Sequence, residues 1–75
     1  MNSPQLTVDA RKMPCPMPLL KLKQALNKIE NTQVVHLIAT DPTSKRDFVS
    51  FVNMTNHQIR FDEADEEIHF YVTKG

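Results

Sequence analysis

Cys15 is the residue of this 75-residue chain best suited to nucleophilic chemistry, and it stands in the segment Met13-Pro14-Cys15-Pro16-Met17-Pro18. It is the chain's one cysteine, so an internal disulfide is excluded and any disulfide would be intermolecular. A thiol attacks as its thiolate, and an ordinary thiol, with a pKa of about 8.5, is mostly protonated at neutral pH. Reactivity at Cys15 therefore requires surroundings that favour the anion.

The prolines around Cys15 predict the beginning of a helix. We expect Cys15 at the N-cap position, with Pro16 and Pro18 at the first and third helical positions, where a missing N–H group loses no intrahelical hydrogen bond. The N–H group of Met17 is then expected to donate to the sulfur. This arrangement predicts a rigid helix terminus with the thiol held at its positive end.

The charges next to this helix terminus also favour the thiolate. Arg11 and Lys12 lie just upstream of Cys15, and the positive end of a helix dipole adds to their effect. A free cysteine is more commonly a small buried apolar residue. The basic, proline-flanked setting is a poor place to bury an inert side chain, so it favours a reactive Cys15.

Other uses of the thiol find less support. Met13, Cys15 and Met17 together offer soft ligands for Cu(I), but Met17 is predicted to begin a helix and Met13 to pack inward, so no metal site is expected. A protease-like Cys-His pair is not indicated, because the histidines are predicted in or beside strands. They are His36, His57 and His69. Glycine-rich phosphate loops and zinc-ligand clusters are missing from the sequence, and we expect no cofactor.

Hydrophobic periodicity predicts six elements that would position Cys15. Strands are expected at 6–10, 33–40, 57–62 and 68–73, and helices at 16–30 and from about Ser44 to Asn56. A right-handed crossover makes the first two strands parallel. We therefore predict an α/β (α+β) two-layer sandwich of β-α-β-α-β-β order, with a four-stranded mixed sheet and both helices on one face. The loops that hold Cys15 and Asp41 should share one rim of the sheet.

The ends of the second helix carry their own signals. Ser44, followed three residues later by Asp47, has the form of a capping box before an apolar run. Asn56 is the commonest non-glycine residue in the left-handed position after a helix, so we expect the helix to stop there. The second strand, apolar on both faces, is predicted to be central in the sheet.

Composition limits the function classes. The formal net charge is zero, which argues against a broad electrostatic grip on nucleic acid. RNA binding by the lysines of the first helix is weakly supported, since aromatic residues are few and mostly assigned to the core. We expect one domain, residues 1–75, with a flexible terminus at 1–4. Without a leader-like or membrane-length apolar run, a soluble cytoplasmic protein is expected.

Charge is unevenly distributed along the chain. A basic stretch without acidic residues contains Arg11, Lys12, Lys21, Lys23 and Lys28, whereas an acidic stretch covers 62–67. This pattern has two equally good explanations: the two stretches are simply solvated surfaces, or they form a docking surface. If docking is correct, the basic stretch steers an acidic partner toward Cys15.

The motifs resemble the TusA/SirA/YedF family of small sulfur-carrier proteins, whose signature is Asp-x-Arg-Gly-x-x-Cys-Pro-x-Pro. Here the signature reads Asp9 to Pro18, with Asp41-Pro42-Thr43-Ser44 to Asp47 as a second block and Thr55-Asn56-His57 as a third. The similarity covers nearly the whole chain. Lys12 and Asn56 replace family glycines, and lysine adopts a left-handed conformation less readily than asparagine.

This resemblance implies a sulfur carrier that accepts a persulfide sulfur on Cys15 from a cysteine desulfurase or related donor. The carrier would relay that sulfur to an acceptor protein, in some members toward 2-thiouridine in tRNA. Residues expected to support Cys15 are Arg11, Pro16, Met17, Pro18 and Asp41, and those expected to dock partners are Lys12, Lys21 and Lys28. We expect a sulfurtransferase-type carrier rather than a stand-alone enzyme, without stable nucleic acid or membrane binding. The alternative is a non-catalytic regulatory or interaction module with a redox-sensing Cys15.

Overall fold

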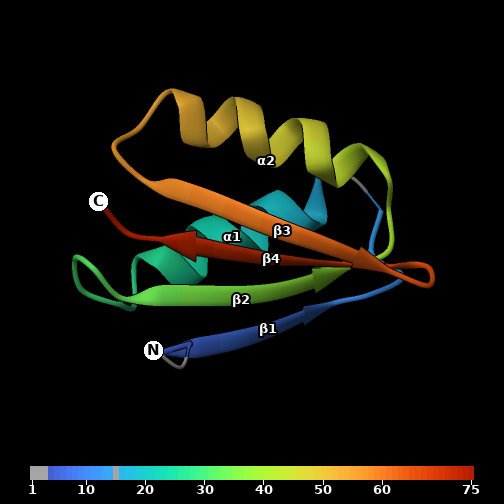
Figure 1. The fold of residues 1–75 in the computed structure, drawn as a ribbon, viewed down its shortest axis with the longest axis horizontal. Helices are drawn as coiled ribbons and strands as arrows, with labels where there is room; N and C mark the ends of the chain where they lie inside the picture. Colours follow the sequence, from blue (N-terminus) through green and yellow to red (C-terminus); the bar gives the residue numbers. More distant parts are fainter. Residues whose placement is uncertain (1–3, 15) are drawn as a thin grey trace.

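The computed structural model describes residues 4–14 and 16–75, and it has the predicted β-α-β-α-β-β order (Figure 1). The elements are β1 (Leu6–Ala10), α1 (Met17–Leu26), β2 (Val34–Ala39), α2 (Thr43–Asn53), β3 (Gln58–Ala64) and β4 (Glu67–Thr73). Their arrangement is an α+β fold in two layers, so the predicted fold class is confirmed.

The four strands form one mixed sheet in the order β1-β2-β4-β3. β1 and β2 are parallel, and β4 pairs antiparallel with both β2 and β3. The predicted central position of β2 is confirmed. In the register, Ala10 lies opposite Ala39, and Ala39 lies opposite Ile68. The ends of β1 and β2 and the beginning of β4 therefore meet at one edge of the sheet, which we call the loop rim.

The hydrophobic core lies between the sheet and the two helices. Alternate residues of β2 point into it, so Val35 and Leu37 are fully buried while His36 between them is half-buried. Leu22 of α1 and Phe48 of α2 are also fully buried, and Phe48 contacts the ring of Phe70 at 4.3 Å between centroids. Both helices thus cover the same face of the sheet, because one face of each strand supplies the core.

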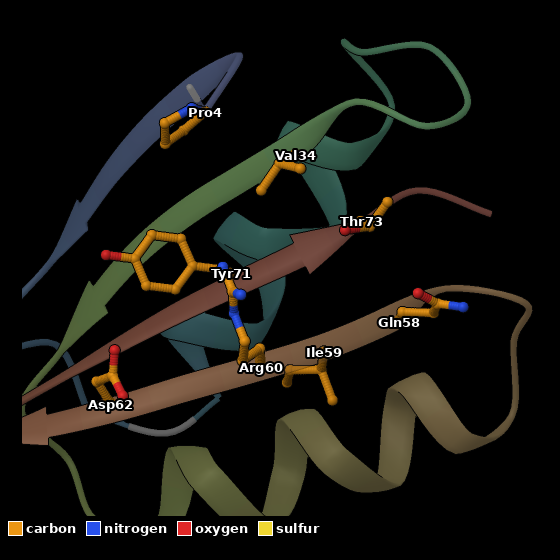
Figure 2. Close-up of a pocket in the computed structure, with 8 residues that line it drawn as sticks. All are labelled: Pro4, Val34, Gln58, Ile59, Arg60, Asp62, Tyr71 and Thr73. Carbon is orange, nitrogen blue, oxygen red and sulfur yellow. The ribbon is translucent and has the colours of Figure 1, made fainter. Parts of the chain in front are cut away.

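The opposite face of the sheet carries a row of stacked rings. His36 stacks on Tyr71 with 4.6 Å between centroids and on His69 with 5.1 Å, and Arg60 lies over Tyr71 at 5.5 Å. A shallow hollow of about 960 Å³ extends over this face toward the edge opposite the loop rim (Figure 2). Residues that line it include Pro4, Gln58 and Thr73. The hollow therefore lies away from the loop that contains Cys15.

The first helix begins later than the sequence predicts. Pro16, rather than Cys15, occupies the N-cap position, and Met17 is the first helical residue. The N–H group of Met17 donates to the carbonyl of Pro14 at 2.9 Å, which closes a turn before the helix. The expected bond from Met17 to the sulfur involves Cys15, which lies outside the described residues.

The same helix also ends earlier than expected. α1 stops at Leu26 instead of Glu30: the Asn27 N–H still bonds four residues back to Lys23 O at 3.2 Å, but the Lys28 N–H bonds three residues back to Ala25 O at 3.0 Å. Such i−3 bonds tighten the chain into turns. Ile29 remains buried, which is why the apolar periodicity extends past the helix.

The predicted capping box at α2 is wrong, because Asp41 takes the role assigned to Ser44. The Oδ1 atom of Asp41 accepts hydrogen bonds from the Thr43 N–H at 2.9 Å and from the Thr43 hydroxyl at 2.8 Å. Ser44 instead points into the protein and is 2% exposed. The side chain two residues before the helix start therefore satisfies the free amide.

Asn56 does not have the predicted left-handed conformation. α2 ends at Asn53, followed by Met54 with a φ of −94°, and the described non-glycine residues with positive φ are Lys12, Thr32 and Asp65. The hydroxyl of Thr55 donates to Val52 O at 2.8 Å and accepts from His57 N–H at 3.0 Å. A turn organised by Thr55 therefore leads from the helix into β3, and no left-handed residue is needed at Asn56.

Candidate functional site

The loop of residues 11–16 lies at the loop rim, between the end of β1 and the beginning of α1 (Figure 1). Lys12 adopts a φ of 64°, the left-handed region that glycine favours. Its N–H group donates to the Thr40 hydroxyl at 2.8 Å, which ties this loop to the end of β2. Met13 N–H reaches back to Ala10 O at 3.4 Å. The backbone on the N-terminal side of Cys15 is therefore held in a specific turn.

Arg11 connects the beginning of this loop to β1 and β4. Its guanidinium forms two bonds to the carboxylate of Asp9, at 2.9 and 3.0 Å, and a third to Glu67 at 3.3 Å. The Asp9 carboxylate also accepts the Arg11 N–H at 3.1 Å. These hydrogen bonds lower the pKa of Asp9 to about 2 and raise that of Arg11. Arg11 therefore braces the loop.

The pairing of Arg11 changes the expected electrostatics around Cys15. A guanidinium bonded to two carboxylates offers little net positive charge to a third group. The positive contribution expected from Arg11 is offset by Asp9 and Glu67. Lys12 and the N-terminus of α1 are the neighbouring features that would still favour a thiolate.

Acidic residues also reach the loop rim. An open depression of about 850 Å³ beside the loop is lined by Asp9, Arg11, Lys12, Thr40 and residues 65–67. The acidic stretch, which the sequence separates from the basic one, folds next to Arg11 and Lys12 because β4 begins at this rim. Sequence reasoning missed Asp9, Thr40 and Glu67 as loop contacts. The Asp9-x-Arg11 spacing is a local signal that could have indicated the Asp9 contact. The contacts of Thr40 and Glu67 follow only from the strand order.

The prolines after Cys15 have different surroundings. Pro18 is fully buried, whereas Pro16 is exposed at the N-cap position. Met17 and Leu20 are 38% and 46% exposed, so the first turn of α1 presents apolar side chains to solvent beside the loop. Pro18 thus anchors the helix start to the core, while Pro16 and Met17, which follow Cys15 in the sequence, are exposed.

The remaining predicted site residues divide between two places. Asp41 caps α2 at the loop rim, as described above. Lys21 lies on α1 and Lys28 in the turn after it, and both line a groove of about 350 Å³ against β1, whereas Lys12 lies in the loop itself. The three lysines predicted to dock partners therefore do not form one patch.

The described residues contain no group of three or more His, Cys, Asp or Glu side chains suited to a metal ion. Among the helices of the described part of the chain, none is both long and apolar enough to cross a membrane. The sequence predicts the three histidines in or beside strands. His36 lies in β2 and His69 in β4, both on the open face of the sheet, and His57 directly precedes β3.

The fold and this loop define a class of small two-layer α+β proteins, in which a loop with the chain's one cysteine connects an edge strand to the first helix. The model of the family described as sulfurtransferase TusA matches residues 6–74. The chain belongs to the TusA family.

Individual relatives agree with this assignment. The sulfur carrier protein TusA of Allochromatium vinosum is 40% identical over 71 residues, which are 91% of this chain and 91% of that protein. YrkI of Bacillus subtilis, described as a candidate sulfur carrier protein, is 33% identical over 70 residues, covering 91% of this chain and 92% of YrkI. The crystal structure of a SirA-like protein from Desulfitobacterium hafniense has the same fold, with a TM-score of 0.85 at 23% identity over 95% of this chain and 99% of that one.

Proposed function

We propose that this protein carries sulfur as a persulfide on Cys15, accepting it from a donor such as a cysteine desulfurase and passing it to an acceptor protein. The observation that carries the proposal is the braced loop of residues 11–16 at the loop rim, in a chain whose relatives are named as sulfur carriers. A chain of 75 residues is too small to build a deep cleft around a sulfur, so we expect the sulfur to be presented to a partner protein.

The proposed transfer exchanges one sulfur–sulfur bond for another. The Cys15 thiolate attacks the outer sulfur of a donor persulfide, a bond forms between the two sulfurs, and the donor cysteine leaves as its thiolate. Delivery repeats the step in reverse, with an acceptor thiolate attacking the outer sulfur on Cys15. No net oxidation occurs in either step, so the carrier requires neither a metal nor a redox cofactor.

The supporting residues have separate roles in this proposal. Arg11 and Asp41 hold the two loops of the rim in place, through Asp9 and Glu67 in the first case and Thr43 in the second. The rigid backbone of Pro16 and Pro18, with Met17 between them, orients the segment after Cys15. A fixed approach to the sulfur favours transfer because it reduces the entropy lost on reaching the reactive geometry.

We further propose that the protein acts in the cytoplasm, where a single reduced cysteine is stable, and that its acceptor lies on a route toward tRNA thiolation. The zero net charge argues that sulfur reaches RNA through an acceptor protein and not through direct RNA binding. An acceptor assay with purified thiolation proteins would test this finer assignment separately from sulfur loading.

Mass spectrometry after incubation with a cysteine desulfurase and cysteine tests the proposal. We expect a gain of about 32 Da, one sulfur atom, on the peptide that contains Cys15, removed by a reducing agent. The Cys15→Ser variant should gain nothing. An unmodified wild-type peptide, together with unchanged partner binding by the serine variant, would overturn the carrier role in favour of a regulatory module.

A further inference from the structure

The groove between β1 and α1 has the shape of a docking site for an extended chain. Its volume is about 350 Å³, and both elements contribute to its walls. The lining residues are Leu6, Thr7, Val8 and Asp9 from the strand and Lys21, Gln24, Ala25 and Lys28 from the helix side. Figure 1 shows β1 at the border of the sheet, with α1 behind the middle of the sheet.

β1 offers backbone groups for pairing along this groove. It is an edge strand, since its neighbour in the sheet order is β2 alone. On the side away from β2, alternate N–H and C=O groups of an edge strand face outward and can bind another strand. Strand addition of this kind supplies affinity through the backbone, while side chains of the added strand supply specificity.

The charge of the groove selects the added segment. Lys21 on α1 is half-buried and Lys28, in the turn after α1, is exposed, and the sequence has no Asp or Glu between residues 10 and 29. The one acidic residue in the lining, Asp9, is bonded to Arg11 and has its charge balanced there. The groove therefore complements a segment that carries carboxylates.

The direction of the groove relates it to Cys15. β1 ends at Ala10 and α1 begins at Met17, so both walls lead to the loop of residues 11–16. A segment lying along β1 would have one end at this loop. Binding there would bring the rest of its protein next to the loop that contains Cys15.

We propose that an extended acidic segment of the protein that exchanges sulfur with this chain pairs with β1 as a fifth strand, with its carboxylates against Lys21 and Lys28. The inference rests on the proposed sulfur-carrier function for the identity of the partner. The surface itself is defined by strand order, the groove and its charge. The main competing explanation is that the two lysines only protect an edge strand from aggregation, a role that charged residues often have.

A peptide experiment tests the surface without sulfur chemistry. The probe is a synthetic seven-residue peptide of alternating glutamate and valine, and the control peptide alternates lysine and valine. We expect the acidic peptide at millimolar concentration to slow amide exchange along Leu6–Ala10 and to shift the NMR signals of Lys21 and Lys28. The double variant Lys21→Glu with Lys28→Glu should bind it about tenfold more weakly, a change of about 1.4 kcal/mol. Absence of binding, or equal binding of both peptides, would overturn the proposal.

A transfer experiment links the surface to the carrier function. Sulfur loading of Cys15 is measured from a cysteine desulfurase with cysteine and, separately, from glutathione persulfide. We expect the ratio of the first rate to the second to fall about tenfold in the double lysine variant. Arg46→Glu, an exposed charge reversal on α2, is the matched control and should leave the ratio unchanged.

The two proposals fail in different ways in this experiment. An unchanged ratio in the double lysine variant, or an equal fall in Arg46→Glu, would contradict strand docking while leaving the carrier role intact. Absence of loading of the wild-type protein from both sulfur sources would contradict the carrier role.

Discussion

Lys12 combines an unfavourable backbone conformation with a position three residues before Cys15 in the sequence. A φ of 64° places its Cβ close to the backbone, and a non-glycine residue there loses about 1–2 kcal/mol relative to a right-handed conformation. The bond from its N–H group to Thr40 helps to hold this conformation. The family motif that this chain resembles has glycine at the same position, where the conformation is not strained.

Replacing Lys12 with glycine should therefore stabilise the protein. We expect the free energy of unfolding in urea to rise by about 1 kcal/mol in Lys12→Gly, because strain is relieved and only part of the gain is lost to the more flexible unfolded chain. Lys12→Ala is the control, since alanine keeps the strain but removes the charge. An equal gain in both variants would assign the effect to the side chain and not to the backbone.

Asp9 reports directly on the brace formed by Arg11. Its pKa is lowered from 3.8 to about 2, first by the side-chain bonds from Arg11 and then by the Arg11 backbone N–H. A lowered carboxyl pKa means that the folded state binds fewer protons than the unfolded state. This contribution to stability is complete above pH 3.8 and is lost as the pH falls toward about 2.

The Arg11→Gln variant tests this brace. We expect the pKa of Asp9, measured by NMR titration of its carboxyl carbon, to return toward 3.8 when the guanidinium is removed. The loop should also exchange its amide protons faster, since the link to Glu67 is lost. If Asp9 titrated normally in the wild-type protein, the Asp9–Arg11 bonds would not persist in solution.

At the scale of elements, the beginning of α2 contains an unusual buried hydroxyl. Ser44 is 2% exposed, and its Oγ atom has no hydrogen-bond partner among the residues that the structure describes. A buried hydroxyl without a partner is unfavourable by about 1–3 kcal/mol in proteins. The capping of this helix does not depend on it, because Asp41 binds Thr43.

Ser44→Ala should consequently leave stability unchanged or raise it by about 1 kcal/mol. Ser50→Ala, on the exposed side of the same helix, controls for the higher helix propensity of alanine. Thermal and urea unfolding of both variants give the comparison. A clear loss of stability in Ser44→Ala relative to Ser50→Ala would mean that the hydroxyl does bind a partner.

The elements themselves were largely predictable from the sequence, whereas their ends were not. Alternation in β1 and β2 and the spacing of Leu22, Leu26 and Ile29 indicated the strands and the first helix, because these patterns follow from which side chains are buried. The helix ends depend on competing local hydrogen bonds. Met17 N–H bonds to Pro14 O, and Asp41 instead of Ser44 caps α2. Neither hydrogen bond alters the pattern of apolar residues, so that pattern could not predict them.

The candidate site was predictable only in part, for a reason that belongs to the whole molecule. Strand order brought the loops with Arg11 and Asp41 to one rim, as expected from parallel β1 and β2. Glu67 is 56 residues away from Arg11 in the sequence, and its place beside the loop depends on β4 pairing with β2. The sequence alone shows the acidic stretch, but it does not show that this stretch lies beside Arg11 in the folded protein.

The stacked rings of the open face couple stability to pH. His36 Nε2 lies 2.8 Å from His69 Nδ1, and His69 Nε2 lies 3.4 Å from the Glu67 carboxylate. Burial lowers the pKa of His36, and the nearby His69 lowers it further. The folded state therefore binds a proton at His36 less readily than the unfolded state does.

Stability should accordingly fall in mildly acidic solution. The contribution of His36 is complete above its ordinary value of about 6.5 and is lost as the pH falls through the lower value of the folded protein. We expect His36→Gln to reduce the slope of unfolding free energy against pH below about 6.5, and His57→Gln, away from this pair, to change it less. An unaltered slope in His36→Gln would show that the histidine pair does not control this dependence.

The position of β4 between β2 and β3 also governs how the chain can be made. Glu67–Thr73 follows every other element in the sequence, yet it supplies the inner pairing of the sheet on both of its sides. While these residues are still inside the ribosome, β2 can pair with β1 on one side only. β3 then has no strand to pair with. We therefore expect the elements that precede β4 to pack only partially during synthesis, and the sheet to close only when the last strand inserts.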